Sequence, residues 1–268
     1  SRAREEEFLQ AAETGDVTRL KSLLTNALLS AINQGNEEIA ETIIEHPKYV
    51  EVSNEVKEHG RAFFYLSKFH DENQFPEEIT PLMLAAQQNR FEVVMALLLK
   101  GEIIDKPHKC DCACSECNEM TQKDELRFAR SRLNAYRALS SEAYISLSSD
   151  DPILTCFELR KELHQVAAEE KYYATEYTRL ATGLSEYVVR LLDKVHSNEE
   201  LHAILSATAE DHNDITPEDL PRLQLAIKYK EKRVSFSDYV DRFVAGFGSS
   251  QLPMYTVGGI YVPLLALF

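Results

Sequence analysis

The chain of 268 residues has little glycine and proline, and little basic charge relative to acidic charge. Glycine and proline number nine each, which favours a helix-rich fold because both residues interrupt regular helices. The 29 lysines and arginines are outnumbered by 44 aspartates and glutamates, giving a net charge of −15. We therefore expect no nucleic-acid partner, because phosphate binding requires a basic surface.

The sequence also lacks the short motifs of common enzyme classes. It contains no glycine-rich phosphate-binding loop and no nucleophile elbow. The acidic runs Arg4–Glu7 and Asn36–Glu41 lack the alternating oxygen ligands and central glycine of an EF-hand loop, so we interpret them as solvated helix faces. We interpret the serine-rich stretch Leu139–Asp151 as helix caps. No enzymatic activity is expected.

Cysteine is nearly absent outside one short stretch. Four of the five cysteines lie in "HKCDCACSEC", His108–Cys117, and Cys156 stands alone. A disulfide framework spreads its cysteines along the chain, and bridges between such near neighbours would stabilise little. The crowding therefore favours metal ligation in a reducing compartment, with unpaired surface thiols as the alternative.

Three segments of the first hundred residues resemble one another. They are Leu9–Leu24, Leu29–Ile44 and Leu82–Gly101, and each predicts a helix, a tight turn and a second helix. An alanine on the first helix allows a neighbouring helix to approach closely. A glycine or asparagine tolerates the left-handed backbone of the turn. The turn positions are Gly15, Gly35 and Asn89.

The third segment opens with "ITPLMLAA", Ile79–Ala86, which is close to the ankyrin opening Thr-Pro-Leu-His-x-Ala. Thr80 is the expected N-cap, and Pro81 suits the first helical position. A generic array of helical hairpins is the alternative. The spacing also departs from the ankyrin period of ~33 residues. Either the first repeat is abbreviated, or residues are missing near Thr25 and Asn26.

The chain after the cysteines predicts further helices. Leu126–Ala167 contains one amphipathic helix ending near Leu139 and a second one capped by Asp150 or Asp151, with Pro152 in its first turn. Lys171–Val195 is another long amphipathic segment. Its apolar positions are Tyr173, Tyr177, Leu180, Leu184, Tyr187, Val188 and Leu191.

Two more helix starts follow. Ser197 and Glu200 have capping-box spacing, and Thr216 caps a short helix beyond Pro221. The sequence as a whole therefore predicts an all-α fold.

These residues carry a family resemblance. Ankyrin-like segments, then "KPHKCDCACSEC" (Lys106–Cys117), then "ARSRLNAYRALSSEAYISLSSDDPILTCFEL" (Ala129–Leu159) resemble the cytosolic N-terminal region of TRPC-type transient receptor potential channels. The resemblance covers most of residues 1–233. It implies an ankyrin-repeat solenoid over 1–104, a zinc-stapled loop over 105–120 and a linker-helix domain over 121–233.

The same resemblance implies the ligands of a zinc site. The family spacing selects His108, Cys112, Cys114 and Cys117, whereas Cys110 falls on a position that the family does not require. Three thiolates and one imidazole form a closed tetrahedral site with no open position for water, so a structural role is expected. A zinc deaminase would have His-x-Glu and Pro-Cys-x-x-Cys, and a nucleic-acid finger would separate its ligand pairs by about a dozen residues.

The family implies a function in ion transport. Its members are tetrameric, non-selective, calcium-permeable cation channels of the plasma membrane, and this region lies on their cytosolic face. We therefore expect self-association into a homo- or hetero-tetramer and contacts with cytosolic regulatory proteins. Tyr173, Tyr177 and Tyr187 are candidate interface residues, and the alternative is that they pack the core of the linker helices. A free-standing ankyrin-type adaptor with a structural zinc site is the alternative function.

The resemblance does not extend to the tail, residues 234–268, which is left unassigned. Its last 26 residues, Phe243–Phe268, are uncharged, but glycines and prolines interrupt them. We therefore do not expect a membrane-spanning helix here, since spanning needs about 20 apolar residues. The chain is expected to be a fragment without a pore, attached to a membrane only through parts that it lacks.

Overall fold

The computed structural model describes residues 17–47, 75–76, 79–195, 254–257 and 260–263, together with residues 10 and 49. The chain divides into two compact units, Ser1–Ser149 and Asp150–Phe268. Several sequence predictions lie outside the described residues. These are the turn at Gly15, the capping box at Ser197 and Glu200, and the cap at Thr216.

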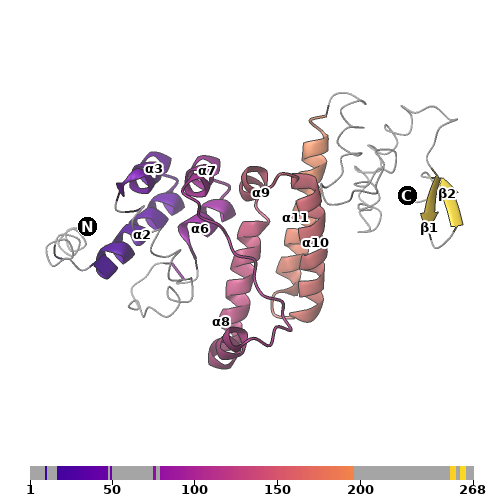
Figure 1. The fold of residues 1–268 in the computed structure, drawn as a ribbon, viewed down its shortest axis with the longest axis horizontal. Coiled ribbons are helices and arrows are strands. Elements are labelled where there is room, and N and C mark those ends of the chain that lie inside the picture. The colour runs from indigo at the N-terminus through magenta and orange to yellow at the C-terminus, as the bar shows by residue number, and fades with distance from the viewer. Residues whose placement is uncertain are drawn as a thin grey trace. The chain divides into compact units, whose positions relative to one another are not determined.

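Two helical hairpins lie side by side in the first unit (Figure 1). The first consists of α2 (Val17–Gln34) and α3 (Glu37–Glu45), and the second of α6 (Pro81–Gln87) and α7 (Phe91–Leu99). Helix α2 packs against α6, and α3 packs against α7. Both turns contain a residue with positive φ, as predicted: Gly35 at 75° and Asn89 at 52°. These hairpins confirm the ankyrin-type stacking expected from the sequence.

Helix α2 differs from the sequence prediction in its length. The second helix of the first segment and the first helix of the second segment are one continuous helix, which passes through Thr25 and Asn26 without a turn. No glycine or proline lies between Val17 and Gln34 to interrupt it. The short spacing between the first two segments therefore reflects a shared helix.

The start of α6 follows the local rules expected from its sequence. The Thr80 side chain accepts a hydrogen bond of 3.2 Å from the Met83 N–H, and Pro81 occupies the first turn, where no N–H is needed. Ala85 and Ala86 are fully buried on this helix, where their small side chains allow close packing.

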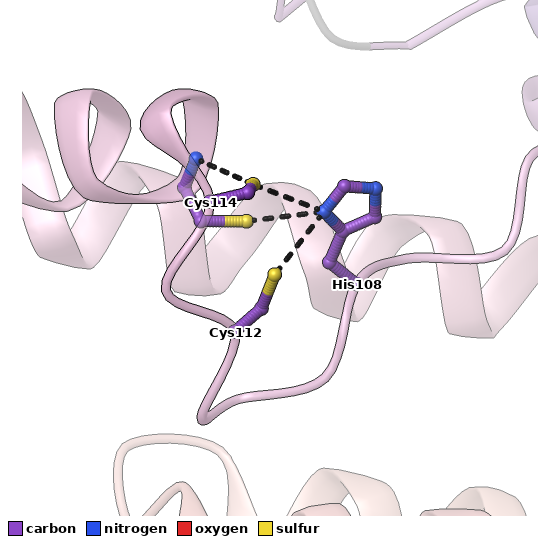
Figure 2. Close-up of side chains that lie close together, drawn as sticks. His108, Cys112 and Cys114 are labelled. Atoms are coloured by element: carbon purple, nitrogen blue, oxygen red, sulfur yellow. Dashed lines mark hydrogen bonds between the residues drawn. The ribbon is translucent and has the colours of Figure 1, made fainter.

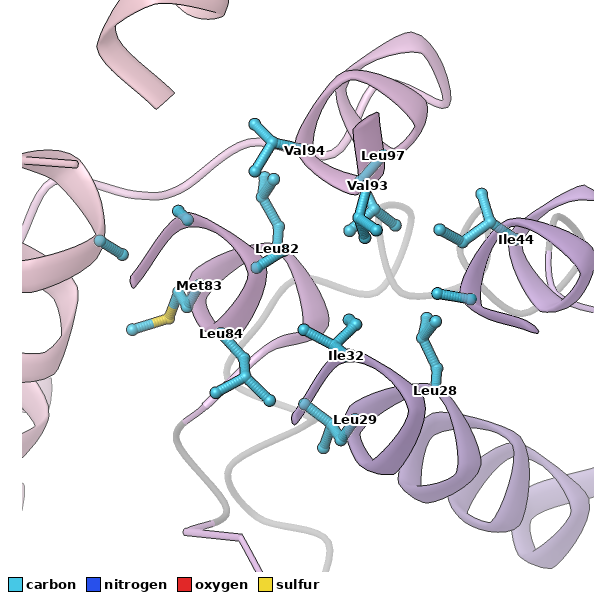
Figure 3. Packing of buried hydrophobic residues seen from close by; sticks show 14 of the residues in the cluster. Leu28, Leu29, Ile32, Ile44, Leu82, Met83, Leu84, Val93, Val94 and Leu97 are labelled. Atoms are coloured by element: carbon cyan, nitrogen blue, oxygen red, sulfur yellow. The ribbon is translucent and has the colours of Figure 1, made fainter. Parts of the chain in front are cut away.

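The core of the repeats collects side chains from all four helices (Figure 3). The largest fully buried members include Leu28 from α2, Ile44 from α3, and Leu82 and Leu97 from the second hairpin. Burying side chains of this size contributes ~1.5–3 kcal/mol each relative to leaving them exposed. Hydrophobic burial therefore accounts for the stability of the repeats.

The same core continues into α8 (Ser115–Leu139) and α9 (Glu142–Ser148). Helix α8 packs on α6 and α9 packs on α7, so the pair extends the stack of hairpins. The Gln87 side chain donates to the Asn134 carbonyl at 2.8 Å, and the Asn89 side chain accepts from the Ala143 N–H at 3.1 Å. Asp124 interrupts α8 with a non-helical backbone and caps its second half by accepting from the Arg127 N–H at 2.9 Å.

The second unit is built on α10 (Pro152–Glu169) and α11 (Ala174–Leu192), which pack against each other. Asp151 caps α10 by accepting from the Leu154 N–H at 3.1 Å, which confirms one of the two predicted caps. Tyr177 is fully buried, and its hydroxyl donates to Glu170 at 3.2 Å.

The proposed interface role of two tyrosines is wrong. Tyr177 and Tyr187 are both buried within the chain, and Tyr173 is half-buried. The rings of Tyr177 and Tyr187 therefore fill the core of their own unit, which is the alternative that the sequence left open.

Within the tail, the structure describes a short antiparallel hairpin of β1 (Met254–Val257) and β2 (Ile260–Pro263). Met254 pairs with Pro263 and Val257 pairs with Ile260. The sequence left this tail unassigned, and its tyrosine, threonine and valine residues have high strand propensity. The other elements of the described residues are helices, in agreement with the predicted all-α class, and none of those helices is both long and apolar enough to span a membrane.

Candidate metal centre

A loop between α7 and α8 brings one histidine and three cysteines together. The ligand atoms of His108, Cys112, Cys114 and Cys117 all lie within 4.8 Å of one another. Figure 2 shows the first three of these side chains pointing toward one another across the loop. Cys117, in the first turn of α8, is buried, whereas His108 is exposed at the opposite side of the group. This His/Cys group could hold a metal ion.

The distances within the group fit tetrahedral coordination. The His108 Nδ1 atom lies 3.6 Å from the Cys112 sulfur, 3.5 Å from the Cys114 sulfur and 3.3 Å from the Cys117 sulfur. A tetrahedral zinc ion with Zn–S bonds of about 2.3 Å and a Zn–N bond of about 2.0 Å holds nitrogen and sulfur about 3.5 Å apart. The geometry also identifies Nδ1 as the imidazole atom that faces the sulfurs.

Local backbone structure places these sulfurs. Cys114 is the N-cap of α8, and its sulfur accepts a hydrogen bond of 3.4 Å from the Cys117 N–H. The Asn118 side chain donates to the Ala113 carbonyl at 3.1 Å and fixes the loop against the first turn. Unpaired N–H groups and the helix dipole make a helix N-terminus favourable for a thiolate.

The two cysteines at the helix start differ in acidity. The backbone N–H of Cys117, followed by hydrogen bonds from the Cys117 and His108 side chains, lowers the pKa of the Cys114 thiol to about 6. Burial, followed by the neighbouring sulfurs of Cys114 and Cys112, raises the pKa of the Cys117 thiol to about 12. The two shifts have opposite directions: the thiolate is favoured at Cys114, and the neutral thiol is favoured at Cys117.

Sequence reasoning missed the capping role of Cys114 and the start of α8 at Ser115. Serine, threonine, aspartate and asparagine are the usual N-caps, so a cysteine gives no such signal. Cys110 is half-buried and is not part of the group of four. Glu116, a conceivable base beside the group, is exposed.

Two family models match adjacent parts of the chain. Ankyrin repeat matches residues 77–111, and Transient receptor ion channel II matches residues 112–174. The chain is homologous to the N-terminal region of TRPC-type transient receptor potential channels. The boundary between the matches falls inside the His/Cys group, which takes His108 from the ankyrin part and its cysteines from the channel-specific part.

Individual proteins similar to this chain support the relationship. Short transient receptor potential channel 3 of Mus musculus is 38% identical over 78% of this chain and 24% of its own length. Transient receptor potential protein of Drosophila melanogaster is 31% identical over 93% of this chain and 23% of its own length. Short transient receptor potential channel 4 of Mus musculus is 34% identical over 85% of this chain and 27% of its own length.

The chain thus spans about a quarter of the length of the curated relatives that it matches. Those relatives are ion channels and not enzymes, in agreement with the absence of catalytic motifs from the sequence. The TRPC-type assignment accounts for both the ankyrin hairpins and the helices α8 to α10.

Proposed function

We propose that this chain forms the cytosolic N-terminal assembly and regulatory region of a calcium-permeable, non-selective cation channel subunit of the plasma membrane. The observation that carries the proposal is the joint match to TRPC-type relatives across the ankyrin hairpins and the helices that follow them. Ankyrin-type hairpins present surfaces for protein contacts, which suits a region where subunits and regulators meet. The proposed regions are 1–104, 105–120 and 121–233, as expected from the sequence.

We further propose that His108, Cys112, Cys114 and Cys117 hold a structural zinc ion. Three sulfurs and one imidazole nitrogen are the donors that zinc prefers, and their spacing suits a tetrahedron. When bound, the ion would supply the positive charge that keeps the buried Cys117 deprotonated. The protein residues would hold the loop against the start of α8 and leave no position open for water, so the site would be structural.

Subunits of the full-length channel are proposed to associate as a homo- or hetero-tetramer through this region, with cytosolic regulatory proteins as further partners. Support comes from two mouse relatives that are named as channels, and from the exposed apolar side chains on the repeats.

A chimera tests the channel assignment. The matching region of the mouse short transient receptor potential channel 3 is replaced by residues 1–233 of this chain, and whole-cell cation current and calcium entry are measured. We expect the chimera to conduct and to migrate as a tetramer on a native gel. Current and assembly should both fall in the chimera carrying Cys114→Ser, but not in the one carrying Cys110→Ser.

The alternative is an adaptor that acts without a channel. A chimera that reaches the membrane without conducting would support the adaptor, provided that the full-length transcript encodes no pore after residue 233. Six apolar spans and a pore loop in that transcript would instead agree with the channel.

A further inference from the structure

The outer helices of the two repeats, α3 and α7, are structurally equivalent. In both turns, the N–H of the residue before the helix donates to the carbonyl five residues earlier, at 2.9 Å for Asn36 and 3.0 Å for Arg90. The two helices begin at Glu37 and Phe91 and have nine residues each. A position on α3 therefore corresponds to the position 54 residues later on α7 (91 − 37 = 54).

Helix α7 carries a row of exposed apolar side chains. Phe91 is 42% exposed, Met95 is 48% exposed and Leu99 is 80% exposed. Spacing of four residues places all three on one face of the helix. The opposite face lies in the repeat core through Val93, Val94 and Leu97. The helix is thus apolar on both sides, although only one side has a partner within the described residues.

Helix α3 carries a row of glutamates at the equivalent positions. Glu37, Glu41 and Glu45 correspond to Phe91, Met95 and Leu99 after the shift of 54 residues. Glu41 and Glu45 are exposed, and α3 contains no lysine or arginine.

The two helices pack side by side, and an ion pair of 3.4 Å between Glu37 and Arg90 joins their N-terminal ends. Because α3 and α7 pack side by side in the same orientation, residues at equivalent positions face the same way. An acidic row therefore runs beside an apolar row on one outer face of the repeats.

We propose that this face binds an amphipathic helix of a partner protein, with apolar side chains on one side and lysines or arginines on the adjacent side. The apolar side would cover Phe91, Met95 and Leu99, and the basic side would lie over Glu41 and Glu45. Apolar rows bordered by charge mark interaction surfaces, and anchors at helical spacing are the usual contacts of a docked helix. The glutamates would set the orientation of the partner and speed its association.

Charge argues against a second copy of the chain as the occupant. A two-fold contact pairs the same face with itself. If the acidic rows meet, they repel each other, and if the apolar rows meet, the α3 helix of the second copy offers no lysine or arginine to the glutamates.

Two designed helical peptides test the proposal, one built from leucine and lysine and the other from leucine and glutamate, each with separate apolar and charged sides. Binding of each labelled peptide to the full chain is measured by fluorescence anisotropy at about 0.15 M ionic strength. We expect the leucine–lysine peptide to bind and the leucine–glutamate peptide not to bind.

Variants of the chain locate the binding face. Leu99→Ser and Met95→Ser should each weaken binding by about tenfold or more, because each removes buried apolar contact. Leu126→Ser is the matched control, since Leu126 is 54% exposed on α8, away from this face. The double variant Glu41→Gln, Glu45→Gln should weaken binding and reduce its salt dependence, whereas Glu125→Gln on α8, next to the Leu126 control, should leave both unchanged. Thermal melting of each variant verifies its fold.

Three results would overturn the proposal. One is the absence of binding by the leucine–lysine peptide. Another is binding that Leu99→Ser and Leu126→Ser affect equally, which would mean attraction by net charge alone. The third is a concentration-dependent dimer of the chain that Leu99→Ser abolishes, because the face would then belong to a second copy.

Discussion

The ankyrin hairpins and the cysteine loop differ in how much of their surface is removed from water. In the hairpins, Leu28, Ile44 and Leu97 are completely buried, and all four hairpin helices contribute to one core. In the loop, no residue from Asp105 to Cys114 is buried. Hydrophobic burial stabilises the first region, whereas the second has almost no apolar surface to bury. We therefore propose that metal ligation, together with a few hydrogen bonds, holds this polar loop in one conformation.

Because different interactions stabilise the two regions, we expect each to unfold without the other. Loss of the metal should release the loop and the first turns of α8 up to Asp124. The second half of α8 has its own cap at Asp124 and packs on α6, so it should remain folded. Five experiments, ordered by the size of the expected effect, test this separation.

Cys114→Ser should have the largest effect. Structural zinc sites contribute ~10–16 kcal/mol in small peptides, so the loss of one ligand in four should weaken metal binding by about a hundredfold or more. Metal analysis of the purified chain and hydrogen exchange across residues 105–123 provide the measurements. The hairpins before Gly101 should keep their protection.

The control for that variant is Cys110→Ser, which should retain one zinc per chain. Loss of the metal in Cys110→Ser, together with its retention in His108→Ala, would indicate an all-cysteine site. A wild-type chain without metal, in which every thiol reacts freely, would remove the zinc proposal altogether.

Leu97→Ala should destabilise the hairpins without releasing the metal. Leu97 is fully buried, and such truncations cost ~2–5 kcal/mol through lost burial and the cavity left behind. Urea unfolding followed by circular dichroism measures the change. Leu99→Ala on the same helix is the matched control and should change the free energy of unfolding by less than ~0.5 kcal/mol. Equal effects of the two variants would mean that the core face of α7 is misassigned.

Ala86→Leu tests close packing between the hairpins. Ala86 is fully buried, so the added side chain should overpack the core and cost ~1–3 kcal/mol of unfolding free energy. Ala168→Leu on the exposed side of α10 should be nearly neutral in the same urea titration. An unchanged midpoint for Ala86→Leu would contradict the packing of α6 against its neighbours.

Base should weaken the hairpins, whereas acid should release the metal. The buried Tyr49 hydroxyl donates to Glu102 at 2.6 Å, and burial, followed by the Glu102 charge, raises the pKa of Tyr49 above its usual value. The folded state therefore keeps this proton while the unfolded state loses it near pH 10. Stability contributed by Tyr49 is complete below pH 10 and falls by about 1.4 kcal/mol per pH unit above it.

Tyr49→Phe removes that titration, so urea unfolding at pH 9 to 11 should show a shallower loss of stability in the variant. Identical pH slopes in the two proteins would contradict the assignment. Metal release depends on pH in the opposite direction. The metal should be lost as the pH falls, because protons compete with the ion for His108 and the cysteines. Zinc should be retained at the alkaline pH that weakens the hairpins.

Thr80→Ala should have the smallest effect, ~1 kcal/mol, because one N-cap hydrogen bond to the Met83 N–H is lost. Thr80→Ser keeps the hydroxyl and should restore most of the stability, as measured by thermal unfolding. Thr80 and Cys114 cap α6 and α8 in the same way, but only the second cap is also a proposed ligand. Similar losses for Thr80→Ala and Cys114→Ser would mean that Cys114 acts as a cap alone.

Sequence reasoning succeeded where the determining interactions are local. Positive φ at Gly35 and Asn89, and the caps at Thr80 and Asp151, depend on a few neighbouring residues. It failed at α2, because the repeated pattern divided one continuous helix between two segments, and the short spacing was attributed to an abbreviated repeat or to missing residues. It also left the role of the α11 tyrosines open, since an apolar stripe can cover either the core of its own chain or a partner.

The sequence by itself determined the types and spacing of the candidate metal donors, the turns at Gly35 and Asn89 and the family relationship. Only the tertiary structure decided that the Nδ1 atom of His108 faces the three sulfurs and that α8 and α9 extend the repeat core. It also placed the glutamates of α3 beside the apolar row of α7. Donor types and turns depend on residues a few positions apart, whereas these arrangements join residues that are distant in sequence and meet only when the helices pack.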